Sequence, residues 1–395
     1  MQEHSRVPKL VERAARSASE IVAKSKAKGD RKTLQDELLK AHRSAKRASL
    51  DEPFLPRDRA GALIQAAMDC RVRLGTAAEA GPEALGNEFL LGNADPLWAT
   101  LLGGLIEKWL TPDAKFIDKP AATAPIPIEN TTTVALFSDW GTGRPPALSV
   151  RDQITNRQVD YMIHLGDIYY AGQEDEVDDR FLNILPQSAN LRRRFALNGN
   201  HEMYSGGHGY FERVLPKLGQ AAGYFCLIND NWRIIGLDTA YENEDLKKPQ
   251  LDWLKSLVTA PNDARKNIVL SHHQLFSCFE NFSARLLKKV GPLLDDGKIH
   301  TWFWGHEHKH IVYKKHRGVL GRCIGHGAIP YLPPGKDCTH PEFKVQFVNR
   351  RIRPDSVQGV NGFAALQLNG PVLEIEYVDE DGFVPFGENL EREIG

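Results

Sequence analysis

Five short clusters of carboxylate, amide, imidazole and phenol side chains stand in the chain, each at the end of an apolar run. Oxygen and nitrogen donors of these kinds are common metal ligands in proteins. Two adjacent metal ions are a recurring means of cleaving phosphate esters. The residue types therefore predict a binuclear phosphoesterase built from Asp139-Trp140-Gly141, Gly166-Asp167-Ile168-Tyr169-Tyr170, Gly199-Asn200-His201-Glu202, Ser271-His272-His273 and Gly305-His306-Glu307-His308.

The first two clusters each place an aspartate directly after an apolar stretch that reads as a buried strand. Asp139 follows the stretch 132–137 and Asp167 follows the stretch 161–165. Two carboxylates that face one another unpaired repel, and a cation between them removes that cost. We therefore expect both aspartates to bind metal.

The last cluster carries two histidines on either side of a glutamate. Alternate residues of a strand point to the same face, so His306 and His308 would face one way and Glu307 the other. Asn200 adds a neutral amide oxygen, a weak ligand that leaves a metal ion electrophilic. These residues complete a set of hard and borderline donors for two ions.

In this order the five clusters resemble the calcineurin-like metallophosphoesterase superfamily, over residues 132–310. The details resemble its purple acid phosphatase branch. Many superfamily members have a metal-binding histidine two residues after the first aspartate, where this chain has Gly141. Tyr170, three residues after Asp167, stands where the purple branch has its tyrosine. The resemblance implies an α/β fold, a four-layered αββα sandwich with the metal ions at the strand ends.

The resemblance also implies a ligand set and a pair of cofactors. Fe3+ would pair with a divalent ion (Fe2+, Zn2+ or Mn2+), because a tyrosinate favours Fe3+. The alternative is that Tyr170 only packs, while Tyr169 or water fills the position. The implied ligands are Asp139, Asp167, Tyr170 and His308 for the first ion, and Asp167, Asn200, His272 and His306 for the second.

The same resemblance assigns catalytic and substrate-binding roles. His201 would donate a proton to the leaving oxygen, and Glu202 would orient it. His273 and His208 would bind substrate. We expect direct attack by a metal-bound hydroxide, with the chain acting as a phosphomonoesterase like the acid phosphatases.

Amino-acid composition divides the chain into three regions. Residues 1–115 are rich in helix-forming residues, 116–131 form a proline-rich linker, and 132–395 form the catalytic domain. In the catalytic domain, apolar runs alternate with stretches of helical composition, which predicts α/β architecture. The segments 362–368 and 372–378, joined at Asn369-Gly370, predict a closing hairpin.

Composition limits the classes of protein. The formal net charge is −1, but residues 1–50 hold 13 Lys and Arg against 6 Asp and Glu. None of the five cysteines forms a CxxC pair. The N-terminal part has no signal-like segment, and its apolar runs are shorter than the ~20 residues of a membrane span. We expect a cytoplasmic protein with reduced thiols and no membrane span; the composition leaves its oligomeric state open.

Two other functions fit the same residues. A phosphodiesterase or nuclease would use the same metal centre and bind polynucleotide through the basic N-terminal helices, so nucleic acid is an alternative partner to a small phosphate ester. A non-catalytic binding protein could keep the fold alone. The complete ligand set argues against the second alternative, because a protein freed from catalysis has no need of every ligand.

Overall fold

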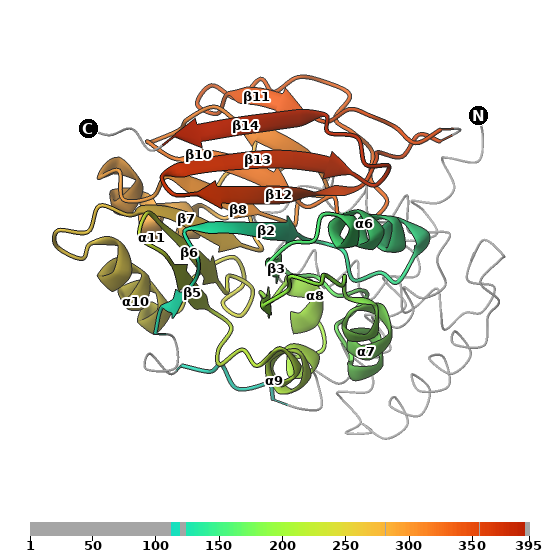
Figure 1. Cartoon of the computed structure of the whole chain (residues 1–395), viewed down its shortest axis with the longest axis horizontal. Coiled ribbons are helices and arrows are strands. Elements are labelled where there is room, and N and C mark those ends of the chain that lie inside the picture. Colours follow the sequence, from blue (N-terminus) through green and yellow to red (C-terminus); the bar gives the residue numbers. More distant parts are fainter. Residues whose placement is uncertain (1–111, 119–123, 281, 355, 392–395) are drawn as a thin grey trace, which may run out of the picture. The chain divides into compact units, whose positions relative to one another are not determined.

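The computed structural model of the chain describes residues 112–118, 124–280, 282–354 and 356–391 (Figure 1). The helices expected within residues 1–110, and residues 119–123 of the proline-rich linker, lie outside the described residues. Among the described residues, no helix has the length and apolar composition that crossing a membrane requires.

Two β-sheets form the centre of the described part. The smaller sheet has six strands in the order β14-β13-β12-β2-β3-β4. Strands β2, β3 and β4 run parallel to one another, while β12, β13 and β14 are antiparallel to their neighbours. Their bounds are β2 Thr131–Phe137, β3 Tyr161–His164, β4 Arg193–Ala196, β12 Gly362–Asn369, β13 Val372–Asp379 and β14 Phe386–Glu391.

The larger sheet has eight strands in the order β1-β5-β6-β7-β8-β10-β9-β11. At its middle β6, β7, β8 and β10 are parallel neighbours. The bounds are β1 Ile126–Pro127, β5 Phe225–Ile228, β6 Trp232–Leu237, β7 Lys266–Ser271, β8 Thr301–Trp304, β9 His310–Tyr313, β10 Leu320–Ile324 and β11 Val345–Val348.

The two sheets share one apolar core. Val134 and Ile163 of the smaller sheet belong to the same buried cluster as Ile234, Ile268 and Phe303 of the larger sheet. Strands with both faces covered carry continuous apolar runs, such as 134–137 in β2 and 268–270 in β7. Apolar burial of this kind is the main favourable term in folding.

Helices cover the outer faces of the sheets. Helix α6 (Pro145–Asn156) buries Ala147, Val150 and Ile154, and α11 (Ala284–Asp295) buries a stripe that includes Leu286 and Val290. The other helices are α7 Glu174–Arg180, α8 Asn200–Met203, α9 Leu215–Leu218, α10 Lys248–Val258, the 3-10 helix Leu182–Ile184 and the π-helix Gly209–Val214. The predicted α/β fold with helices around paired sheets is thus confirmed for the described part (Figure 1).

The predicted strands and closing hairpin are present, but the expectation of reduced thiols is wrong for one pair of cysteines. β12 and β13 pair antiparallel across the turn at Gly370, as predicted. Cys278 and Cys338 form a disulfide, with 5.5 Å between their Cα atoms and 60 residues between them in sequence. Their wide separation hid the pairing, because the fold alone brings the two segments together. Cys226 and Cys323 are free and buried.

Candidate metal centre

The ends of neighbouring parallel strands bring the predicted clusters together. β2 leads to Asp139 and β3 leads to Asp167, and the N–H of Asp139 donates to the carbonyl of Gly166 (3.0 Å). Both aspartates have left-handed backbone, with φ of 55° and 72°. Non-glycine residues in that region are uncommon and concentrate at functional sites. The strand ends therefore turn sharply to present their carboxylates.

One set of donor atoms surrounds the phenol of Tyr169. Its Oη lies 3.1 Å from Asp139 Oδ1, 3.3 Å from Asp167 Oδ2 and 3.0 Å from His308 Nε2. His308 Nε2 lies 3.3 Å from Asp139 Oδ1. Four donors from three separate segments thus converge on one small volume, here called the first donor set.

A second donor set surrounds the amide oxygen of Asn200. This Oδ1 lies 2.8 Å from His272 Nε2 and 2.9 Å from His306 Nδ1. His272 Nε2 also lies 3.3 Å from Asp167 Oδ1. The two oxygens of Asp167 therefore belong one to each set, so this carboxylate can bridge two ions.

The spacing of the donors fits metal ions. An ion with bonds of ~2.1 Å at right angles holds its ligand atoms ~3.0 Å apart. The separations in both sets, from 2.8 to 3.3 Å, lie around that value. Asp139, Asp167 and His272 also form a compact group of metal-binding donors.

The protonation of His272 also indicates that this site favours a positive charge. Its Nδ1 lies 3.0 Å from the carbonyl of Leu165, which can only accept, so Nδ1 carries a proton. Nε2 then directs a lone pair at the oxygens of Asp167 and Asn200 unless a second proton or a metal ion lies between them. Burial lowers the pKa of His272, but the charge and hydrogen bond of Asp167, together with the charges of Asp139 and Glu202, outweigh burial and raise that pKa to about 9. The site thus calls for positive charge at this point.

The tyrosine that lies in the first donor set is Tyr169, the alternative named in the sequence analysis, rather than Tyr170. Tyr169 supplies the phenol, whereas the ring of Tyr170 packs against the guanidinium of Arg180, with Cζ 5.2 Å from the ring centroid. A Cβ on Gly141 would lie 2.8 Å from the Cα of Ile168. This close approach lets the Gly141 carbonyl accept from the N–H of Tyr169 (2.9 Å). No space remains at position 141 for the histidine of other superfamily members.

His201 lies beside both donor sets, but its orienting partner is not the expected one. Its Nδ1 is 2.7 Å from the carbonyl of Tyr170, and its Nε2 is 3.8 Å from Asp167 Oδ2. Glu202 accepts instead from the N–H groups of Asp167 (3.2 Å) and Gly199 (3.1 Å). Glu202 therefore ties two ligand-bearing loops together, and the Tyr170 carbonyl orients His201.

The two residues expected to bind substrate, His273 and His208, have different surroundings. The ring of His273 is buried beside His306, with centroids 4.7 Å apart, and its Nδ1 lies 3.1 Å from Thr239 Oγ1. Burial lowers the pKa of His273 well below its usual value, so this ring is neutral. His208 pairs with Glu212 (3.1 Å) on the π-helix. The structure therefore brings His273 to the donor sets. None of the described contacts of His208 is to a donor residue.

The segment that carries His306 and His308 is a bend rather than a continued strand. β8 ends at Trp304, and His306 has a φ of 63°. Glu307 still points away from the donors, because it accepts from the Trp304 indole (3.1 Å) and the Ser277 hydroxyl. The expected separation of the two imidazoles from the glutamate therefore holds for a different backbone reason.

Sequence reasoning missed residues that support the donors without touching them. Asp238, after β6, accepts from the N–H groups of Ala240 and Tyr241 (both 3.0 Å) and from the amide of Asn198, two residues before Asn200. Its place directly after an apolar strand is the one signal that could have indicated it. Trp140, Trp302 and Trp304 are buried core residues.

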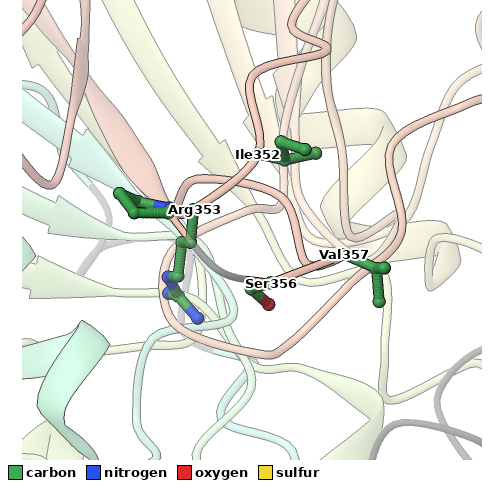
Figure 2. Close-up of a pocket in the computed structure, with 5 residues that line it drawn as sticks. Ile352, Arg353, Ser356 and Val357 are labelled. Carbon is green, nitrogen blue, oxygen red and sulfur yellow. The ribbon is translucent and has the colours of Figure 1, made fainter.

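An open hollow on the surface is formed by other residues. It is lined by Ile352, Arg353, Pro354, Ser356 and Val357 (Figure 2). None of these residues belongs to either donor set. The hollow therefore contributes nothing to the metal centre.

The comparisons with known proteins agree with this geometry. The calcineurin-like phosphoesterase family model matches residues 132–310, which hold all seven donor residues of the two sets. A comparison with curated proteins found no sequence match.

Two solved structures resemble the chain at low sequence identity. One is purple acid phosphatase PPD1 from yellow lupin (Lupinus luteus) seeds, at 16% identity and a TM-score of 0.53, covering 67% of this chain and 54% of that one. The chain thus spans about half the length of the lupin protein. The other is GAP50, the anchor in the inner membrane complex of Plasmodium, with the same identity and TM-score, covering 67% of this chain and 89% of that one. At this identity both likenesses show the fold. The family match identifies residues 132–310 as a calcineurin-like phosphoesterase domain.

Proposed function

We propose that the chain hydrolyses phosphate monoesters at a two-metal centre held by the two donor sets. The observation that carries this proposal is the pair of four-donor sets that share the Asp167 carboxylate. Tyr169 takes the place for which the resemblance suggested Tyr170. The ligands proposed are Asp139, Asp167, Tyr169 and His308 for the first ion and Asp167, Asn200, His272 and His306 for the second.

The donor chemistry favours different ions in the two sets. A phenolate and two carboxylates are hard anions, which suit Fe3+ in the first set. Two imidazoles and an amide in the second suit a divalent ion such as Zn2+, Mn2+ or Fe2+. Five positive charges against the three of Asp139, Asp167 and Tyr169 would leave a net charge of +2. A metal-bound hydroxide would lower the net charge to +1, which still attracts an anionic phosphate ester.

The roles of the residues follow from their contacts. When bound, the two ions would activate water and neutralise charge on the phosphate. A carbonyl only accepts, so the contact with Tyr170 places one proton of His201 on Nδ1. Nε2 is then the atom that can carry a second proton and pass it to the leaving oxygen. Glu202 holds the loops of Asp167 and Gly199 at a fixed separation.

The test compares two neighbouring phenol deletions. Purified protein loaded with iron and zinc should bind two ions, absorb in the visible range and hydrolyse an aryl phosphate monoester. Tyr169→Phe should abolish the visible band, because the phenolate that donates charge to Fe3+ is lost. Tyr170→Phe is the matched control and should keep the band.

Other outcomes would redirect the assignment. Faster turnover of an aryl diester than of the monoester would favour the phosphodiesterase or nuclease alternative. A band lost in Tyr170→Phe and kept in Tyr169→Phe would contradict the ligand set. Failure of the reconstituted protein to bind metal would leave only a non-catalytic role on this fold.

A further inference from the structure

Helix α7 holds the loop that carries both tyrosines. The side chain of Glu176 is only 2% exposed and accepts from three N–H groups of this loop. Its oxygens lie 2.7 Å from the N of Tyr170, 2.8 Å from that of Ala171 and 3.2 Å from that of Gln173. A single buried carboxylate thus fixes the backbone just beyond Tyr169.

Arg180, one turn later on the same helix, holds the other side of the loop. Its Nη1 donates to the carbonyl of Tyr169 (2.8 Å) and to Glu176 (3.1 Å). Its guanidinium lies over the ring of Tyr170. Arg180 therefore contacts both the backbone of Tyr169 and the ring of Tyr170.

The loop that these two residues hold serves the metal centre at two points. The phenol of Tyr169 enters the first donor set, and the carbonyl of Tyr170 accepts from His201. A shift of this loop would move a metal donor and the partner of the proton donor together. A buried ion pair costs desolvation, so a helix-stabilising role alone accounts poorly for it.

We propose that Glu176 and Arg180 are positioning residues that select Tyr169, rather than Tyr170, as the phenol of the metal centre. This inference rests on the proposed function. It extends it, because it explains why adjacent tyrosines take different roles. The guanidinium of Arg180 packs over the ring of Tyr170. The backbone hydrogen bonds made by Glu176 and Arg180 fix the loop in the conformation that directs the Tyr169 ring towards the first donor set.

The chain offers a matched control for the experiment. Arg213 forms an ion pair with Asp178, also on α7, but none of its described contacts is to the loop of the two tyrosines. Arg180→Gln and Arg213→Gln therefore each remove one arginine–carboxylate pair from the same helix. Metal-free proteins are titrated with Co2+ against a chromophoric chelator, and iron-loaded samples give the visible band.

The expected result separates positioning from simple stability. Arg180→Gln should weaken binding of one of the two ions at least tenfold and shift the visible band, whereas Arg213→Gln should keep the wild-type values. Equal values for the two variants would overturn the inference. If Arg180→Gln does not fold, Arg180→Lys decides in the same assay, where weakened binding supports the inference and wild-type affinity overturns it.

The wild-type protein separates failure of the inference from failure of the proposed function. If the wild type binds no metal, the proposed function fails. If it binds two ions and Arg180→Gln matches Arg213→Gln, only the positioning role fails.

Discussion

At the scale of single residues, Asp238 bears a buried charge with a measurable cost. Burial raises the pKa of its carboxyl to about 6, although its hydrogen bonds partly oppose this. The folded pKa lies above the unfolded value, so the ionised group destabilises the fold as pH rises from about 4 to 6, and by a constant amount above that. The buried Oδ1 of Asn198 accepts no hydrogen bond from the residues that the structure describes.

Asp238→Asn should therefore stabilise the protein by about 1–3 kcal/mol at pH 8. The asparagine oxygen can keep the two backbone N–H donors, and its NH2 can donate to a flipped Asn198. Urea unfolding at pH 8 and pH 4 measures the effect, which should largely vanish at pH 4. A variant less stable than the wild type at pH 8 would contradict this account of the charge.

At the scale of elements, the disulfide joins the segment before α11 to the segment before β11. In the chain-entropy estimate, closing a loop of 60 residues stabilises a protein by about 4 kcal/mol, and measured values are often lower. Cys278→Ser with Cys338→Ser should lose up to that amount in denaturant unfolding. Reductant should lower the stability of the wild type similarly and leave the double variant unchanged.

Thiol counting gives an independent check on the pairing. The chain has five cysteines, so denatured wild-type protein should show three thiols before reduction and five after. Five thiols before reduction would show that the pair is not formed in the purified protein.

Elements were predictable to the extent that local sequence decides them. The apolar stretches 132–137 and 161–165 coincide to within one residue with β2 and β3, because such stretches are stable only when buried. The donor clusters were evident because polar residues directly after buried strands gather at one edge of a sheet. Spacing could not choose between Tyr169 and Tyr170. That choice depends on contacts with Gly141 and with α7, which only the fold creates.

At the scale of the whole molecule, the interior encloses histidines that must stay neutral. Burial lowers the pKa of His164 to about 3 and that of His326 to about 4. Neither ring has a hydrogen-bond partner among the described residues. Their folded pKa values lie below the unfolded value of about 6.5. Above that pH both rings are neutral in the folded and unfolded states, so they do not affect the free energy of unfolding. That free energy falls as the pH drops from about 6.5 towards the folded pKa values of about 3 and about 4.

Replacing these two histidines should reduce the loss of unfolding free energy that occurs as the pH falls below about 6.5. At pH 5 each histidine should cost about 2 kcal/mol relative to pH 8. The variant His164→Leu with His326→Leu should therefore gain on the wild type as the pH falls. Unfolding free energies at pH 8, 6 and 5 test this, and a constant difference between the two proteins would refute it.

The close approach of Gly141 to Ile168 also bears on how such a centre can evolve. A histidine at position 141 would need its Cβ within 2.8 Å of a backbone atom, so that single substitution is blocked while the loop keeps its path. The same approach holds Tyr169 in place. A tyrosine-type centre and a histidine-type centre are therefore separated by a joint change of loop and side chain. In this chain, Gly141→His alone would have to displace the loop that carries Tyr169.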